Sequence, residues 1–298
     1  MFLQENLNQK KTASYKDIRL ELLEDIIIFN EQFEELKYEV CLTENALVAT
    51  SDASPKPEEK ESLLKRMGDG AKKIWKTIIE YLTNLYDKIV RFFSDYLNKV
   101  SLKNKKSRFN YLYMALQVAK ANPLHPSIPK EVELIKEYDV KEYSGKITSL
   151  FREETSDANT YRNRVEANIK KLEDTIKTEE ERLKTAKRDK VSIDEAIRIF
   201  DTRFPSINAL VGTVESNTKT ILEKLKAEAT KYSSENNDNM ANEVRSKIST
   251  ANKAISFALK AIVKITSFVN ASVDYKPRIN IMLNKEGREQ QKRAKFSL

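Results

Sequence analysis

Hydrophobic residues recur every three or four positions through most of the chain, which is the pattern of amphipathic α-helices. The first such run predicts a helix from Tyr15 or Lys16 to about Thr50. One face of this helix carries the apolar residues Ile18, Leu22, Ile26, Phe29, Phe33, Leu36 and Val40. A small, polar segment with Pro55 and Pro57 follows it and predicts a linker.

The second helix is predicted to start near Pro57 or Glu58 and to pause at Gly68-Asp69-Gly70. From Ala71 to Val100 it becomes the most amphipathic segment of the chain. Its wide apolar stripe includes Trp75, Ile78, Ile79, Leu82, Leu85, Ile89, Phe92 and Phe93. This stripe favours a core helix, but its aromatic content and cationic border also suit a membrane interface or a partner surface.

The pattern then predicts a helix at 107–121, a proline-rich connector, and a helix from about Lys130 towards Arg152. A heptad-like seam follows, interrupted at Glu179, as in a solvated coiled coil. The seam consists of Val165, Ile169, Leu172, Ile176 and Leu183.

Two breaks are predicted in the last third of the chain. Phe204-Pro205 should interrupt the helix, with Ser206 capping the next one. The polar segment 233–239 predicts a turn. A further strong helix should run from about Val244 to near Val273.

These elements predict an all-α fold, an elongated antiparallel helical bundle with long coiled-coil-like helices. We divide the chain into five segments: an acidic N-terminal helix (1–50), a linker (51–60), a basic amphipathic segment (61–121), a bundle body (130–273) and a basic tail (274–298). The composition agrees, because only 5 Gly and 7 Pro occur among 298 residues.

The residue counts exclude several kinds of chemistry. Cys41 and His125 are the only residues of their types, so an internal disulfide and a Cys/His zinc site are impossible. His125 lies between Pro123 and Pro126, in a stiff connector that favours a solvated role. We therefore expect no enzyme, catalytic residues, metal, cofactor or small-molecule substrate.

Charge is distributed unevenly around a net value of +8. Residues 1–60 are acidic, whereas 65–108 and the C-terminal tail are basic, which suits contact with a polyanion. We predict non-specific contact with DNA phosphates through Lys72, Lys73, Lys76, Lys103, Lys105, Lys106 and Arg108. Incidental imbalance on a solvated surface is the alternative.

Targeting segments are not expected. The residues Met1 to Glu5 lack the basic and apolar regions of a secretory signal. No uncharged apolar run reaches the length of a transmembrane helix, about 18 residues.

The first hundred residues resemble internal head, or prohead-core, proteins of large tailed bacteriophages. The features that carry the resemblance are the acidic helix, a Leu-x-Glu site, the Ser/Pro/Lys linker and the Lys/Trp/Phe helix. The resemblance implies an N-terminal propeptide that a prohead protease removes. The candidate cut follows Glu44 in Leu42-Thr43-Glu44 and precedes Asn45. Leu22-Leu23-Glu24, inside the helix, is a less accessible second candidate.

The leading hypothesis is thus a virion structural protein, made in the host cytoplasm and held in the virion interior. Its partners would be other virion proteins, itself or DNA, and it is either retained in the head or ejected with the genome. One alternative is a membrane-active helical protein that meets a membrane surface with helix 71–100. The other is a helical scaffold or adaptor.

Overall fold

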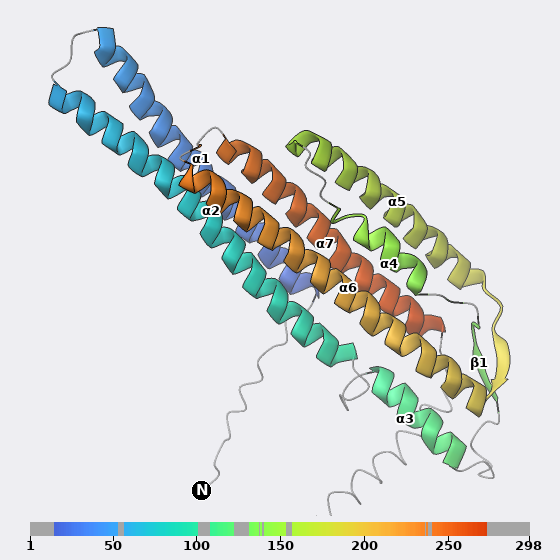
Figure 1. Cartoon of the computed structure of the whole chain (residues 1–298). Coiled ribbons are helices and arrows are strands. Elements are labelled where there is room, and N and C mark those ends of the chain that lie inside the picture. Colours follow the sequence, from blue (N-terminus) through green and yellow to red (C-terminus); the bar gives the residue numbers. More distant parts are fainter. Residues whose placement is uncertain are drawn as a thin grey trace, which may run out of the picture.

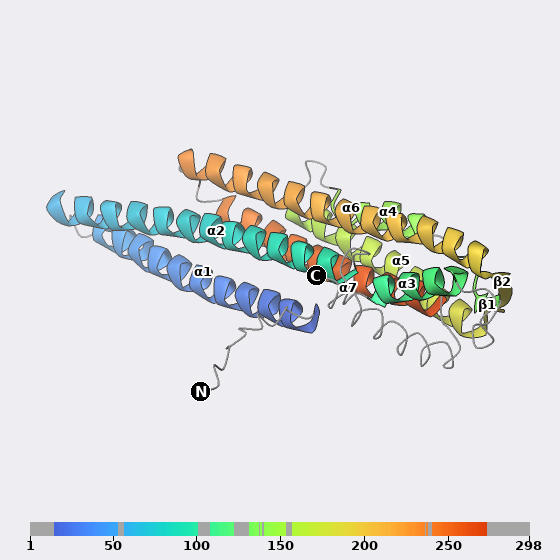
Figure 2. The ribbon, with the colours of Figure 1, turned by 90° about the horizontal axis from the view of Figure 1, so that it is seen from below.

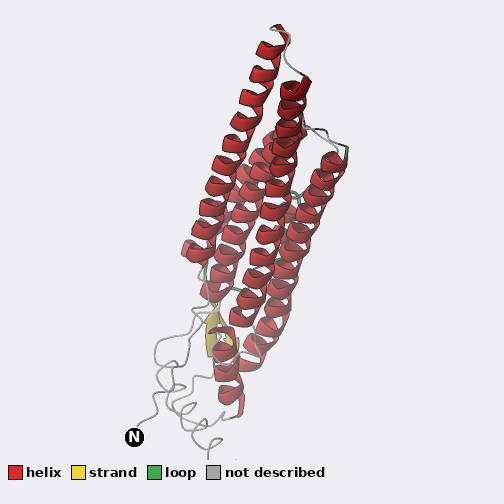
Figure 3. Ribbon diagram, turned by 90° about the vertical axis from the view of Figure 1, so that its left-hand side faces the viewer, coloured by secondary structure: helices red, strands yellow, loops and turns green. Residues whose placement is uncertain are grey.

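The structure, a computed structural model, consists mainly of long helices that lie side by side with roughly aligned axes (Figures 1 and 3). It describes residues 15–52, 57–100, 108–121, 131–136, 138, 140–152, 157–235, 237 and 240–272. The helices are α1 (Tyr15–Asp52), α2 (Pro57–Val100), α3 (Arg108–Ala121), α4 (Lys141–Thr148), α5 (Ala158–Thr185), α6 (Ile193–Ser234) and α7 (Ala241–Ser272). The strands β1 (Glu131–Leu134) and β2 (Asp189–Ser192) form one small antiparallel sheet. The predicted all-α bundle is confirmed.

Contacts between the helices fix their directions. Lys88 pairs with Asp25 and Tyr81 stacks on Phe29, so α2 runs antiparallel to α1. Helix α6 also runs antiparallel to α2 (Figure 1). By contrast, α7 runs parallel to α2, since Tyr81 and Tyr96 bond to Asn252 and Thr266. Helices joined by a short connection are antiparallel, whereas helices that meet from distant parts of the sequence need not be.

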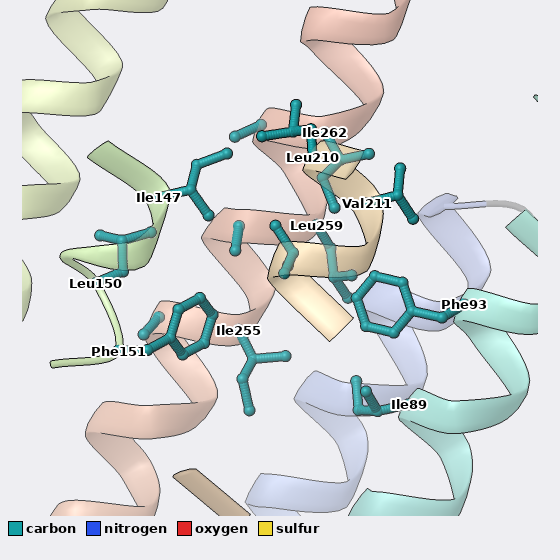
Figure 4. Close-up of a cluster of buried hydrophobic side chains, with 14 of the residues drawn as sticks. Ile89, Phe93, Ile147, Leu150, Phe151, Leu210, Val211, Ile255, Leu259 and Ile262 are labelled. Carbon is teal, nitrogen blue, oxygen red and sulfur yellow. The ribbon is translucent and has the colours of Figure 1, made fainter. Parts of the chain in front are cut away.

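The hydrophobic core runs along the middle of the bundle, between α2, α4, α6 and α7. Figure 4 shows side chains from these four helices converging, with Phe93, Ile147, Val211 and Leu259 among them. All four are fully buried. Small residues at 251, 254, 258 and 261 on α7 are also buried, which lets neighbouring helices approach closely.

Two of the described helices begin with side-chain caps. Asp157 accepts hydrogen bonds from the backbone N–H groups of Asn159 and Thr160 at the start of α5. The Ser192 hydroxyl accepts one from the Glu195 N–H at the start of α6. Each cap satisfies N–H groups that have no partner inside the helix, so these two starts are encoded locally.

The helix predicted from Lys130 to Arg152 is wrong. The structure has β1, an irregular stretch and the short helix α4 instead. In β1, Val132 and Leu134 are buried and alternate with glutamates, which is the two-residue period of a strand. Strand β1 pairs with β2, which lies more than fifty residues later, in the register Val132↔Val191. That partner is not visible in the local sequence.

The predicted interruptions of two helices are also wrong. Helix α2 continues through Gly68 and Gly70, because the long buried stripe that begins at Ala71 outweighs one turn without strong helix formers. Helix α6 continues through Pro205. Burial of Phe204 and Ile207 holds both sides of the proline. Ser206 does not cap a helix: its hydroxyl donates to the Thr202 carbonyl within α6.

Several predicted boundaries are confirmed to within a few residues. Helix α1 ends at Asp52 and α2 begins at Pro57, on either side of the predicted linker. Helix α3 matches the predicted helix 107–121, and α6 ends at Ser234 within the predicted polar turn. The tip of the α1–α2 hairpin extends beyond the ends of α6 and α7 (Figures 1 and 2).

Candidate nucleic-acid interface and cleavage segment

Exposed cations gather on one stretch of α2. Lys65 and Arg66 are exposed, as are the predicted phosphate contacts Lys72, Lys73 and Lys76. We call these five residues the α2 basic cluster. The first and the last are 11 positions apart, which is about 16 Å along a helix. Their exposure follows from the amphipathic pattern, which places them opposite the buried stripe.

Most of the cluster carries uncompensated charge. Within the described residues only Lys76 forms an ion pair, a 3.7 Å contact with Glu80 one turn later. Both of its side chains are mostly exposed, so the pair is readily exchanged for another anion. Asp69 is the one acidic residue between Lys65 and Lys76. The cluster therefore presents four exposed cations without an ion pair on the described part of α2.

The other predicted phosphate contacts cannot be added to this surface. Lys103, Lys105 and Lys106 lie outside the described residues. Arg108 begins α3, but its side chain is not among those described.

The apolar stripe of α2 is buried in the bundle. Ile78, Leu82, Leu85, Ile89 and Phe93 are at most 1 % exposed. Trp75 and Phe92 are also buried, and Ile79 is partly buried against the core. The structure thus places the whole predicted membrane or partner face inside the fold, as the core interpretation expects. Contact with a membrane would require α2 to leave α1, α6 and α7.

The candidate cleavage segment lies inside α1. Leu42, Glu44 and Asn45 are exposed on this helix. The Thr43 hydroxyl donates to the Glu39 carbonyl at 2.8 Å, within the preceding turn. The segment is therefore accessible but helical, and a protease that binds an extended substrate must first unwind it.

A buried arginine joins three elements at the other end of the bundle. Arg203 of α6 donates hydrogen bonds to the Ser272 hydroxyl at 2.9 Å and to the carbonyls of Ile135 and Lys136. Its guanidinium lies 6.0 Å from the Tyr138 ring centre. Burial lowers the pKa of Arg203 to about 10, so it remains charged at neutral pH. These contacts hold β1 and the end of α7 against α6, which is a structural role.

Two tyrosines form further polar contacts inside the bundle. The Asn252 amide donates to the Tyr81 oxygen between α7 and α2. The Tyr96 hydroxyl donates to the Thr266 hydroxyl at 2.9 Å. Burial raises the pKa of Tyr96 to about 12 and moves that of Tyr81 above its usual range. Both rings therefore stay neutral at physiological pH and act as structural hydrogen-bonding groups.

A groove of about 380 Å³ between α5 and α7 was not predicted from the sequence. Ile176, Phe257 and Ala261 line it together with lysines and glutamates, and the Lys264–Glu180 ion pair of 2.9 Å crosses it. The break of the heptad seam at Glu179 was the one signal in the sequence, because an interrupted seam leaves two helices incompletely packed.

The described part of the chain contains neither a cluster of metal ligands nor a membrane-spanning helix. No group of three or more His, Cys, Asp or Glu side chains is arranged to hold a metal ion. None of the described helices is long and apolar enough to cross a membrane. Cys41 is exposed on α1, and His125 lies outside the described residues.

Comparison of the chain with family models, with curated proteins and with solved structures gives no match.

Proposed function

We propose that this chain is a non-enzymatic helical structural protein that contacts nucleic-acid phosphates through the α2 basic cluster. The observation that carries the proposal is the exposure of five cations over about three helical turns, with one ion pair among them in the described structure. Lysines on a rigid helix bind phosphates through charge and release counterions from the nucleic acid. Such contact is independent of base sequence.

A salt titration tests this proposal. Binding of a fluorescent DNA duplex is measured by anisotropy at several salt concentrations, for the wild type and for K72Q/K73Q/K76Q. Each lost phosphate contact reduces the slope of log K against log salt by about 0.9. We expect the triple variant to bind more weakly, with a slope smaller in magnitude by about 2 to 3.

The matched control is K170Q/K171Q/K177Q on α5. These three lysines are exposed, and Glu173 and Asp174 lie among them in the sequence. The control removes the same formal charge from a surface of mixed sign, so its slope should stay close to that of the wild type. An equal loss in both variants would reject the α2 basic cluster as the interface and leave only a general effect of net charge.

We further propose that the protein belongs to the interior of a phage head and that residues 1–44 are a propeptide. The resemblance of the first hundred residues motivates this proposal. Residues 1–44 contain ten Asp and Glu against five Lys and Arg. Their removal would raise the net charge by five, from +8 to +13, and would favour contact with packaged DNA.

The packing of α1 determines what the removal of residues 1–44 would change. Removing residues 1–44 would take Phe29 and Phe33 out of the core. It would also remove Asp25 and Glu34, the acidic partners of Lys88 and Arg245. Cleavage would therefore uncover apolar surface and free two cations on α2 and α7. Such a change suits a protein that assembles in one state and acts in another.

Intact-mass spectrometry of the protein from its native particle tests the propeptide proposal. We expect a chain that begins at Asn45. A chain that retains residues 1–44 would reject proteolytic maturation, while the nucleic-acid proposal would still be decided by the salt titration.

A further inference from the structure

Helix α1 has a second apolar face that no described element covers. Six large hydrophobic side chains are exposed in the described part of the chain, and four of them are on α1. These are Ile27 (54 %), Ile28 (52 %), Tyr38 (66 %) and Leu42 (50 %). The apolar side chains that pack on α2, including Phe29 and Phe33, lie on the opposite side of the helix.

Spacing shows that the exposed residues form one stripe. Positions 24, 28, 31, 35, 38 and 42 are separated alternately by four and three residues, as in a heptad seam. Ile27 borders this stripe. We call it the outer α1 face, and it consists of Glu24, Ile27, Ile28, Glu31, Glu35, Tyr38 and Leu42. Regular seam spacing on an exposed face is typical of a helix that packs on two sides.

The charge of this face selects its partner. Glu24, Glu31 and Glu35 are exposed and form no ion pair with other described residues. Two copies of the face packed antiparallel would bring Glu31 of one copy opposite Glu35 of the other, which is unfavourable. A segment that is both basic and apolar fits the face better than a second copy of α1 does.

The C-terminal segment 274–298 has this chemistry. It contains seven Lys and Arg against three Asp and Glu, together with Ile279, Ile281, Met282, Leu283 and Phe296. The charge of this segment is therefore opposite to that of the outer α1 face, and both carry large apolar side chains.

The segment is also long enough to reach that face. Arg245 pairs with Glu34, and α7 runs antiparallel to α1 from that point, so its end approaches the N-terminal part of α1. Ser272 lies 27 residues beyond Arg245, which is about 40 Å along α7. The 26 residues that follow Ser272 span up to about 90 Å when extended. The end of the chain can therefore lie beside Tyr38 and Leu42.

We propose that the basic segment 274–298 docks on the outer α1 face of its own chain. Its cations lie beside Glu24, Glu31 and Glu35, and its apolar residues cover Ile28, Tyr38 and Leu42. The interaction neutralises part of the positive charge of the tail for as long as α1 is present. It does not depend on nucleic-acid binding or on cleavage.

Distance measurement between two spin labels tests the proposal in the full chain. Cys41 is the single native cysteine and is exposed on α1, so it takes one label, and S297C takes the other. Docking predicts a narrow distribution of short distances between them. The charge-reversal variant E31K/E35K should lose this narrow peak, and the compensating change R288E/K292E in the same chain should restore it.

The control D174K/E181K reverses two exposed charges on α5 and should keep the peak. A broad distribution in the wild type, or a peak that E31K/E35K leaves unchanged, would overturn the proposal. A mixture of two chains, each carrying one of the two labels, distinguishes the tail of the same chain from the tail of a second copy. A narrow peak in that mixture would mean that the tail comes from a second copy, which rejects docking within one chain.

Discussion

Helices α1 and α5 both lie on the outside of the bundle and both contact α7, but their attachment differs. Among the α1 side chains whose burial is described, residues 24–46, the fully buried ones are two aromatic rings one turn apart, Phe29 and Phe33. From α5, Tyr161, Val165 and Leu172 are buried over three turns. Ion pairs from Glu166 and Glu180 to α7 accompany these side chains.

The outward faces of the two helices differ as well. The exposed side of α5 is mostly charged, so water solvates it and it needs no further packing partner. The exposed side of α1 carries four hydrophobic side chains. A helix with one apolar face needs one neighbour, and a helix with two needs a second. The comparison therefore predicts that α1 depends on a few aromatic contacts and a further partner, while α5 depends on contacts distributed along its length.

The largest effect should come from the aromatic contacts of α1. Phe33 is 1 % exposed, and the Arg245 guanidinium lies 4.7 Å from its ring centre. We expect F33A to lower the free energy of unfolding by about 3–5 kcal/mol, because it leaves a cavity and removes the cation–π contact. Urea unfolding followed by circular dichroism measures this change.

The matched control for F33A is Q32A, at an exposed polar position of the same helix. It should change stability by less than about 0.5 kcal/mol. If Q32A proved as destabilising as F33A, the loss would come from the helix as a whole and not from the buried ring of Phe33.

A smaller effect is expected where the two helices of the hairpin approach most closely. A Cβ atom at Gly70 would lie 2.7 Å from the Val40 Cγ2 atom, which is too close. We expect G70A to be neutral or destabilising in the native chain and stabilising by about 1 kcal/mol in a V40A background, where its helix propensity acts without the clash. A double-mutant cycle measures the coupling, and additive effects would contradict the close approach.

The smallest effect should come from the charged attachment of α5. Hydrogen bonds from Lys253 and Lys264 lower the pKa values of Glu166 and Glu180, respectively, below 4.5. Because the folded pKa lies below the unfolded one, these pairs stabilise the fold above the unfolded pKa. That stabilisation is lost as the pH falls through the folded pKa.

Comparison of the wild type with K253Q/K264Q measures this contribution. The Tm of the variant should be slightly lower at neutral pH, and the difference should shrink as the pH falls through the lowered folded pKa values of the two carboxylates. The exposed pair K170Q/K171Q serves as the control and should show no such dependence on pH. A Tm difference that persisted in acid would mean that the lysine stems, rather than their charges, hold α5.

Much of the candidate site follows from the sequence alone. The amphipathic pattern of α2 keeps Lys72, Lys73 and Lys76 off the apolar stripe that contains Ile78 and Leu82, so their exposure was predictable. The hydrogen bonds of Arg203 were not predictable, because its partners are a hydroxyl and two carbonyls more than sixty residues away in the sequence. Nothing in the local sequence distinguishes this arginine from a solvated one.

The sequence by itself determined the all-α class, the long helices and the apolar stripe of each, because helical periodicity and propensity are local properties. The tertiary structure decided the rest. Strand β1 exists because β2 pairs with it, and α6 passes through Pro205 because the core holds both sides of the helix. Parallel packing of α7 on α2 likewise arises from contacts such as Tyr96 with Thr266. These features depend on residues distant in the chain, whose free energy of packing outweighs a local preference.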